Sequence, residues 1–260
     1  MHLSAVIITF NEEKNIARCL ESLQGVAEEI IVVDSFSTDK TKEICEAYGV
    51  KFVQRSWTGY SDQKNHANGL ASTEYILSID ADEVLSAELQ QSITRLQEPY
   101  ADAYGMNRLT SYCGHWIHHC GWYPDHKIRI FKKGIAQWKG LIHETLHFEK
   151  PTKVVALKGD LLHYSFHTMG QYVRQQDKFT DLTAETAFSK GKKTSSWGVF
   201  LRPKWRFFRD FILKKGFLDG KWGYQVCKIM AFATFMKYVK LQQLHTQNKQ
   251  QNKINQQNKK

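Results

Sequence analysis

The sequence predicts an α/β fold in which helices cover both faces of a mainly parallel sheet. Over residues 1–80, apolar runs of strand length alternate with segments that have helical periodicity. This alternation is typical of strands joined by crossover helices. Polar residues stand directly after several of the apolar runs, at the strand ends where open parallel sheets bind ligands.

The elements are expected in a regular order. A buried strand at 4–9 leads into a helix that Asn11 caps and whose apolar residues fall at i, i+3, i+4 and i+7. These residues are Ile16, Cys19, Leu20 and Leu23. Further strands are expected at 29–34, 50–54 and 75–79, and further helices at 39–48, 62–70 and 168–188. The aromatic-rich region 100–165 is expected to face the substrate and to hold a few more strands.

Charge divides the chain into two parts. Residues 1–188 hold 19 basic and 24 acidic residues, whereas 189–260 hold 17 basic and 2 acidic residues. We expect a main domain at 1–188, a basic, aromatic, helical extension at 189–245 and a disordered tail of Gln, Asn and Lys at 246–260. A basic extension of this kind favours docking to an anionic partner.

The cysteines and apolar runs indicate the compartment. Five scattered cysteines do not form the even, dense pattern of a secreted disulfide framework, so a reducing, cytosolic setting is expected. The apolar run 3–10 has no basic region before it and is expected to be a strand. The apolar stretch 229–236 is shorter than the ~20 residues that span a bilayer, so no transmembrane helix is expected.

Three strand ends offer carboxylates or amides to one crevice. Thr9, Asn11 and Glu12 end the first strand and Asp34 ends the second, while the Asp80-Ala81-Asp82 sequence ends the fourth. On extended backbone, Asp80 and Asp82 would point to the same side. Such a pair suits a hard divalent ion, Mg²⁺ or Mn²⁺. A solvated turn is the commoner explanation of an isolated Asp-x-Asp, but its position after a strand favours the metal site.

Several segments resemble the family 2 glycosyltransferases of GT-A fold. The segments are Ala5-Val6-Ile7-Ile8-Thr9-Phe10-Asn11-Glu12-Glu13, Glu29-Ile30-Ile31-Val32-Val33-Asp34-Ser35 and Tyr75-Ile76-Leu77-Ser78-Ile79-Asp80-Ala81-Asp82-Glu83. Later segments are similar to the beta-1,4-glucosyltransferases that build lipopolysaccharide core. These are Gly121-Trp122-Tyr123-Pro124-Asp125, Arg129-Ile130-Phe131, His143-Glu144 and His163-Tyr164-Ser165.

The resemblance implies an inverting transfer of a hexose, glucose, from a UDP-sugar such as UDP-glucose. The implied acceptor is lipopolysaccharide core or another lipid-linked glycan at the inner face of the cytoplasmic membrane. It implies that the nucleoside contacts Thr9, Asn11, Glu12 and Asp34, with support from Lys64 and Asn65. Asp80 would contact the ribose or the metal, and Asp82 would bind the metal, which is Mg²⁺ or Mn²⁺.

The resemblance also points to a catalytic base. Glu144 is the first choice and Asp125 the second; the alternative for Glu144 is an exposed carboxylate paired with Lys139. Arg129, His143 and Trp122 would contact acceptor or phosphate, although Arg129 could equally form a surface ion pair. His163 would complete the metal shell or contact the diphosphate, although a lone His is more often structural.

A cluster of cysteines and histidines could bind zinc. Its members are Cys113, His115, His118, His119 and Cys120. Their spacing matches no standard zinc module, so an acceptor-binding loop is the better interpretation.

The basic aromatic extension has competing interpretations. It could lie on an anionic membrane as a peripheral anchor, or its aromatic side chains could pack as core. Because no recognisable nucleic-acid module is present, we expect no nucleic-acid partner. Alternatives for the whole protein are a capsule or exopolysaccharide transferase, a nucleic-acid-binding protein and a nucleotidyltransferase. The last would need a Gly-rich basic loop after the first strand, where Asn11-Glu12-Glu13 stands instead.

Overall fold

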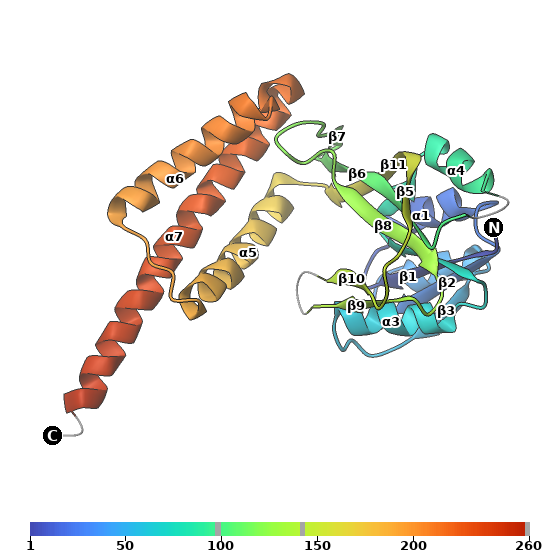
Figure 1. The fold of residues 1–260 in the computed structure, drawn as a ribbon, viewed down its shortest axis with the longest axis horizontal. Helices are drawn as coiled ribbons and strands as arrows, with labels where there is room; N and C mark the ends of the chain where they lie inside the picture. Colours follow the sequence, from blue (N-terminus) through green and yellow to red (C-terminus); the bar gives the residue numbers. More distant parts are fainter. Residues whose placement is uncertain (97–99, 141–143, 258–260) are drawn as a thin grey trace. The chain divides into compact units, whose positions relative to one another are not determined.

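The computed structural model describes residues 1–96, 100–140 and 144–257, and it divides into two compact units. The first unit comprises Met1–Thr110 and Pro124–Ser165, and the second comprises Ser111–Tyr123 and the chain from Phe166 onward. The boundary expected at residue 188 therefore differs from the one observed. The reason is that the helix at 169–189 packs against the long C-terminal helix of the second unit (Figure 1).

The first half of the sheet is parallel. Its strands run in the order β3-β2-β1-β4, and their bounds are β1 (Leu3–Thr9), β2 (Glu29–Asp34), β3 (Lys51–Gln54) and β4 (Tyr75–Asp80). The carboxyl ends of β1 and β2 are level, because Thr9 is paired with Asp34. Ile8 is paired with Asp80, so the polar residues after all three strands share one edge.

Antiparallel strands extend this sheet beyond β4. The order continues β8-β6-β11-β5, with bounds β5 (Glu83–Leu85), β6 (Ala103–Tyr112), β8 (His126–Lys132) and β11 (Val154–Phe166). The two-residue strand β7 (His115–Trp116) pairs with the end of β6. A separate hairpin consists of β9 (Ala136–Lys139) and β10 (Thr145–Phe148). The predicted α/β fold is confirmed, and the parallel part of its sheet consists of β3, β2, β1 and β4.

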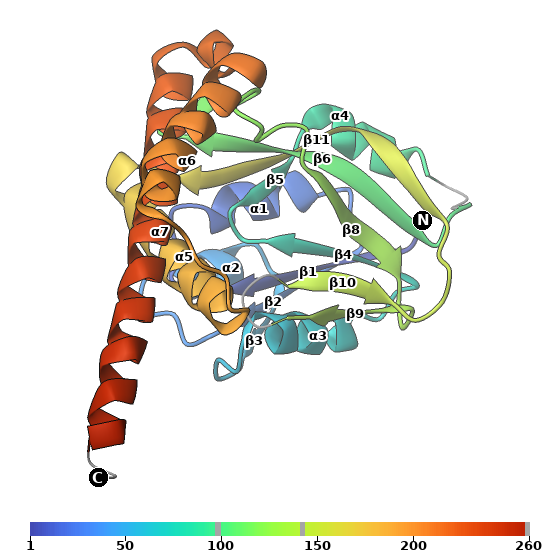
Figure 2. The same ribbon diagram turned by 60° about the vertical axis from the view of Figure 1, so that its left-hand side comes forward.

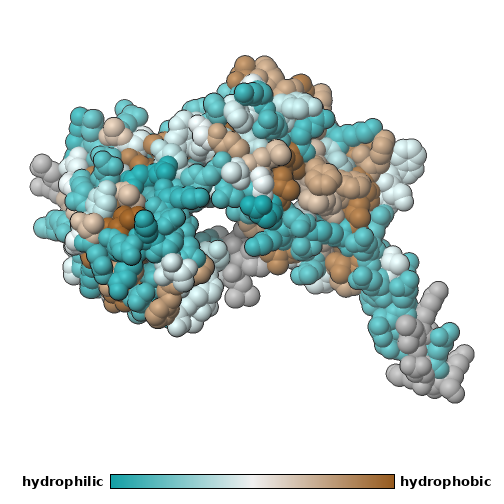
Figure 3. Space-filling view, turned by 180° about the vertical axis from the view of Figure 1, so that it is seen from behind, coloured by the Kyte–Doolittle hydropathy of each residue, from teal (hydrophilic) through white to brown (hydrophobic). Residues whose placement is uncertain are grey.

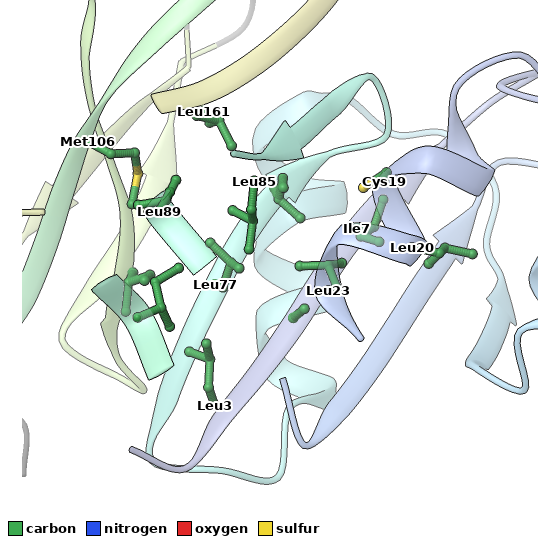
Figure 4. Close-up of a cluster of buried hydrophobic side chains, with 14 of the residues drawn as sticks. Leu3, Ile7, Cys19, Leu20, Leu23, Leu77, Leu85, Leu89, Met106 and Leu161 are labelled. Carbon is green, nitrogen blue, oxygen red and sulfur yellow. The ribbon is translucent and has the colours of Figure 1, made fainter. Parts of the chain in front are cut away.

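Side chains that alternate along β1 enter two different cores. Leu3, Ala5 and Ile7 pack with residues of α1 (Ile16–Leu23), α2 (Thr41–Ala47) and α4 (Ala87–Thr94), as Figure 4 shows for part of this cluster. Val6 packs on the opposite face with residues of α3 (Tyr60–Leu70) and of the hairpin, which lies beside α3 in Figure 2. The period-2 alternation of a strand thus buries both faces of the sheet.

The second unit is mainly helical. Its elements are α5 (Met169–Ser189), α6 (Ser196–Phe208), the π-helix η1 (Arg209–Leu213), the 3-10 helix η2 (Gly216–Asp219) and α7 (Gly220–Gln257). Its core brings Tyr112 and Cys120 of the 111–123 segment against Tyr172 of α5 and Cys227 of α7. Over the described residues, none of the helices is both long and apolar enough to cross a membrane.

Two local expectations are wrong. The N-cap of α1 is Asn15, whereas Asn11 adopts a left-handed conformation with φ of 56° in the loop before it. The tail expected to be disordered continues α7 as far as Gln257. Gln and Lys have high intrinsic helix propensity, so a helix that begins in packed residues can extend into the polar residues from 246 onward, which are exposed at 246–252.

A close approach between α4 and β11 depends on Gly159. It has φ of 91°, and a Cβ atom there would lie 2.8 Å from Leu89 Cα. Gly134 provides a matched control, since its φ is also positive at 83° but no atom lies within 4 Å of the added Cβ.

We expect Gly134→Ala to lower the free energy of unfolding by about 1–2 kcal/mol through backbone conformation alone. Gly159→Ala should cost about 1–3 kcal/mol more because the added methyl group displaces α4. Urea unfolding followed by circular dichroism compares the two variants. Equal losses of stability would show that α4 does not need this close contact.

Candidate active site

Hydrogen bonds join the loops that follow β1 and β2. The Thr9 hydroxyl donates to Asp34 Oδ1 over 3.0 Å, and the Thr38 backbone N–H donates to Asn11 Oδ1 over 2.8 Å. The backbone N–H of Glu12 donates to the Thr41 hydroxyl over 2.8 Å. Three predicted donor-binding residues, Thr9, Asn11 and Asp34, therefore form one cross-linked edge that is ordered by the protein itself.

Lys64 links two carboxylates of the site. Its ammonium group lies 2.8 Å from Asp80 Oδ1 and 3.0 Å from Glu144 Oε1, and its side chain is 3% exposed. The same ammonium lies 4.7 Å from the centre of the Trp138 ring. Lys64 thereby brings together α3, the end of β4 and the residue that precedes β10. Glu144 is paired with Lys64, so the alternative in which it pairs with Lys139 is wrong.

Asp80 is held ionised by two cations. Burial alone would raise the pKa of its carboxyl group, but Lys64 and Arg129 outweigh that effect and hold the pKa well below its usual range. The Arg129 guanidinium donates to Asp80 Oδ2 over 2.8 Å. Both carboxylate oxygens of Asp80 therefore face a protein cation.

Arg129 and Glu83 form a buried pair that sequence reasoning did not single out. Arg129 lies 2.6 Å from Glu83 Oε1, and the Glu83 side chain is 0% exposed. Glu83 also accepts from the Asp80 backbone N–H over 3.1 Å and lies 3.5 Å from Arg108. Burial lowers the pKa of Arg129, but Glu83 and Asp80 outweigh this and raise it. The surface ion pair considered for Arg129 is thus wrong. The only sequence signal for Glu83 is its place directly after Asp82.

Asp80 is the last residue of β4, but Asp82 occupies the turn between β4 and β5, so the expectation of extended backbone holds for Asp80 and is wrong for Asp82. The carbonyl oxygen of Asp82 accepts from the Tyr164 N–H over 2.8 Å. Its carboxylate lies 3.2 Å from His163 Nε2, and Thr110 lies 3.3 Å from His163 Nδ1. The turn therefore separates the partners of the two aspartates: Asp80 contacts cations, whereas Asp82 contacts a histidine.

Asp82 and His163 fit the chemistry of a divalent metal. Mg²⁺ and Mn²⁺ sites commonly use only one or two protein carboxylates and take further oxygens from substrate phosphates. Burial raises the pKa of Glu12, a hydrogen bond from Asn15 lowers it, and the charges of Asp82, Asp39 and Asp80 raise it, because several carboxylates gather at this edge. Within residues 1–96, 100–140 and 144–257, no group of three or more acidic, His or Cys side chains could hold a metal by itself.

A cavity of about 500 Å³ adjoins these residues. Its lining residues are Asp80, Arg108, His126, Lys127, Ile128, Arg129, Trp138, Glu144, Thr145 and Leu146. The Nε atom of Arg129 and the Nε1 atom of Trp138 are buried without a hydrogen-bond partner in the described part of the chain. Since buried N–H groups are normally satisfied, a ligand rich in acceptor oxygens suits this cavity.

The other residues predicted for the site lie outside this cluster of charged side chains. Asn65 exchanges two hydrogen bonds of 2.9 Å with the backbone of Trp138 and so anchors β9. Asp125 lies 2.9 Å from both Arg108 and Lys127. Trp122 belongs to the second unit, where its ring centre is 5.5 Å from that of Tyr172. His143 lies outside the described residues.

The cysteine and histidine cluster of the 111–123 segment belongs to the second unit. His119 Nδ1 lies 2.9 Å from Asp219, and Cys120 is buried beside Cys227. No metal-ligating group is found there among the described side chains.

Comparison with known proteins identifies the family. The sequence model described as "Glycosyl transferase family 2" matches residues 4–157. The chain belongs to this family. The glycosyltransferase is 33% identical over 255 residues to an uncharacterized glycosyltransferase of Rickettsia typhi, with 93% of this chain and 87% of the relative covered. It is 27% identical to the lipopolysaccharide core biosynthesis glycosyltransferase LpsC of Rhizobium meliloti, with 94% and 93% covered.

Solved structures similar to this glycosyltransferase include S. aureus TarS residues 1–349. That match has a TM-score of 0.46 and 17% identity, and it covers 92% of this chain and 81% of TarS. Another is glucosyl-3-phosphoglycerate synthase of Mycobacterium tuberculosis in complex with Mn²⁺, UDP and glucosyl-3-phosphoglycerate. It has a TM-score of 0.34 and 20% identity, with 42% and 44% covered.

The buried pair of Arg129 and Glu83 should contribute to the free energy of unfolding. Arg129→Met would leave Glu83 without its closest cation, so we expect the free energy of unfolding to fall by about 3–5 kcal/mol. Lys132→Met is the control, because Lys132 pairs with Asp102 at 3.3 Å on the surface and should cost no more than about 1 kcal/mol. Urea unfolding measures both losses. Similar losses for the two variants would contradict the assigned role of Arg129.

Proposed function

We propose that this family 2 glycosyltransferase moves a hexose, glucose, from a UDP-sugar to a lipid-linked glycan. The observation that carries the proposal is the bridge that Lys64 forms between Asp80 and Glu144 beside the cavity of about 500 Å³. The cavity has the size of a small-molecule site. Carboxylates from different elements thus adjoin a space that can hold one sugar.

The donor would bind along the edge formed after β1, β2 and β4. Thr9, Asn11, Glu12 and Asp34 would contact the nucleoside, and Asp82 and His163 would hold Mg²⁺ or Mn²⁺. When bound, the metal would neutralise charge on the departing diphosphate as a Lewis acid. Asp80 contacts Lys64 and Arg129 through its two oxygens, so we assign it to the ribose side of the site.

Glu144 would act as the base in a single displacement. The acceptor hydroxyl oxygen forms a bond to the anomeric carbon while the bond from that carbon to the diphosphate oxygen breaks, and its electron pair leaves with UDP. The hydroxyl proton passes to the Glu144 carboxylate, and the anomeric configuration inverts. Asp125 is less suited to this role because its carboxylate is engaged by two cations at 2.9 Å, whereas Glu144 meets one.

The acceptor and location follow from the relatives and from charge. LpsC is described as a lipopolysaccharide core biosynthesis glycosyltransferase, which supports lipopolysaccharide core as the acceptor. The segment 189–245 holds 13 basic and 2 acidic residues. Trp197, Leu201 and Trp205 of α6 are all more than half exposed. We propose that this extension docks peripherally on the anionic inner face of the cytoplasmic membrane.

Glu144→Gln tests the base. We expect UDP-glucose binding to persist, because the amide keeps the shape of the side chain, and transfer to fall by about 10²–10⁴-fold. Glu149→Gln is the control, since Glu149 is an exposed residue just after β10. Steady-state transfer and calorimetric donor binding are measured on all three proteins. Unchanged turnover of Glu144→Gln would move the role to Asp125 or another group.

Asp82→Asn tests the metal. Because an amide oxygen replaces a charged ligand, we expect UDP binding in the presence of Mn²⁺ to weaken by at least about 10–100-fold. Binding without Mn²⁺ should change little. Asp102→Asn is the control, since Asp102 is 41% exposed and pairs with Lys132. If Asp82→Asn binds UDP and Mn²⁺ as tightly as the parent by calorimetry, the metal assignment is wrong.

A further inference from the structure

Helices α6 and α7 of the second unit enclose an apolar groove of about 610 Å³. Its lining residues are Ser196, Val199, Phe200, Pro203, Lys204, Phe207, Lys228, Ala231, Phe232 and Phe235. Phe200 and Phe232 remain 54% and 53% exposed although each is large and apolar. Hydrophobic residues gather on the face of this unit seen in Figure 3, whereas the far end of α7 is polar. Exposed apolar surface of this kind marks a binding site.

Two lysine side chains line the groove. Lys204 and Lys228 line it and are exposed. Their ammonium groups lie 3.7 Å from the ring centre of Phe200 and 4.5 Å from that of Phe207. The ion pairs of the second unit involve Arg206, Arg209, Lys240 and His119. Within the described residues, Lys204 and Lys228 are therefore free to meet an external anion.

An apolar groove lined by two lysines that have no ion-pair partner among the described residues selects one kind of occupant. An alkyl chain matches the phenylalanine lining, and a phosphate group matches the two ammonium groups. The excess of 17 basic over 2 acidic residues in 189–260 favours an anionic surface over an uncharged one. We propose that the groove binds one alkyl chain of an anionic phospholipid of the membrane, with Lys204 and Lys228 at its phosphate.

This inference rests on the proposed membrane docking and makes it specific. Docking by charge alone needs no defined groove, whereas chain capture requires saturable binding of one lipid molecule. Each further methylene that enters the groove should tighten binding about fourfold. An ion bound only at the lysines would show no dependence on chain length.

Binding of single-chain alkyl phosphates below their micelle concentration tests the proposal with the full chain. We expect one-to-one binding of dodecyl phosphate by native mass spectrometry and calorimetry, with decyl and octyl phosphate progressively weaker. Inorganic phosphate and uncharged dodecyl maltoside should each bind at least about tenfold more weakly. Equal binding of inorganic phosphate, or an affinity that is independent of chain length, would overturn the proposal.

Matched variants locate the site. Phe200→Ala/Phe232→Ala should lower dodecyl phosphate affinity by at least about tenfold. Phe208→Ala/Phe217→Ala should not, because these side chains are similarly exposed but do not line the groove. Lys204→Gln/Lys228→Gln should weaken binding, unlike Lys192→Gln/Lys193→Gln. Thermal unfolding verifies that each variant is folded.

Two outcomes separate this inference from the proposals it rests on. In the first outcome, dodecyl phosphate does not bind, but the protein still sediments with vesicles of anionic lipid in a salt-dependent way. Membrane docking by charge is then supported, and binding of an alkyl chain in the groove is wrong. If Phe200→Ala/Phe232→Ala instead converts a dimer to a monomer in sedimentation, a second copy occupies the groove and the proposal is also wrong. Donor binding is measured without lipid, so neither outcome bears on glycosyl transfer.

Discussion

The buried ammonium group of Lys64 is the constraint on which the candidate site depends. A charge that is 3% exposed is tolerated only if its partners are close, and here the partners are Asp80 and Glu144. Because these residues come from α3, β4 and the segment before β10, satisfying one charge fixes the relative positions of three elements. Breaking such a pair would leave an uncompensated charge, which is why the site and the fold cannot be separated energetically.

Strand pairing in the sheet positions the other residues of the candidate site. Parallel pairing in register brings the ends of β1 and β2 level, and the hydrogen bonds between the following loops shape the expected nucleoside edge. Antiparallel pairing of β5 with β11 then places His163 opposite Glu83, next to Asp82. The Asp82–His163 pair and the buried Arg129–Glu83 pair are therefore consequences of strand pairing between segments that are distant in sequence.

The sequence predicts those features that depend on local residue patterns and on the segments that resemble family 2 glycosyltransferases. The strands at 29–34 and 75–79, the α/β class and the closeness of Asp80 to Glu144 could be predicted. The ion-pair partners of Asp80 could not, because Lys64 and Arg129 reach it only through long-range packing that leaves no periodic signal. Local patterns predicted Asn11 as the cap of α1, whereas the cap is Asn15. The polar composition of 246–257 predicted disorder, because composition does not register that the packed part of α7 stabilises the helix there.

Release of UDP from UDP-glucose by the purified chain is the most direct measurement of the central claim. We predict slow, saturable UDP release with Mn²⁺ that stops when the ion is chelated, because water can replace the absent glycan acceptor. A panel of other nucleotide-sugars should bind more weakly at the same edge. Failure to bind or hydrolyse any nucleotide-sugar, or release of pyrophosphate in place of UDP, would contradict the assignment of this site to glycosyl transfer.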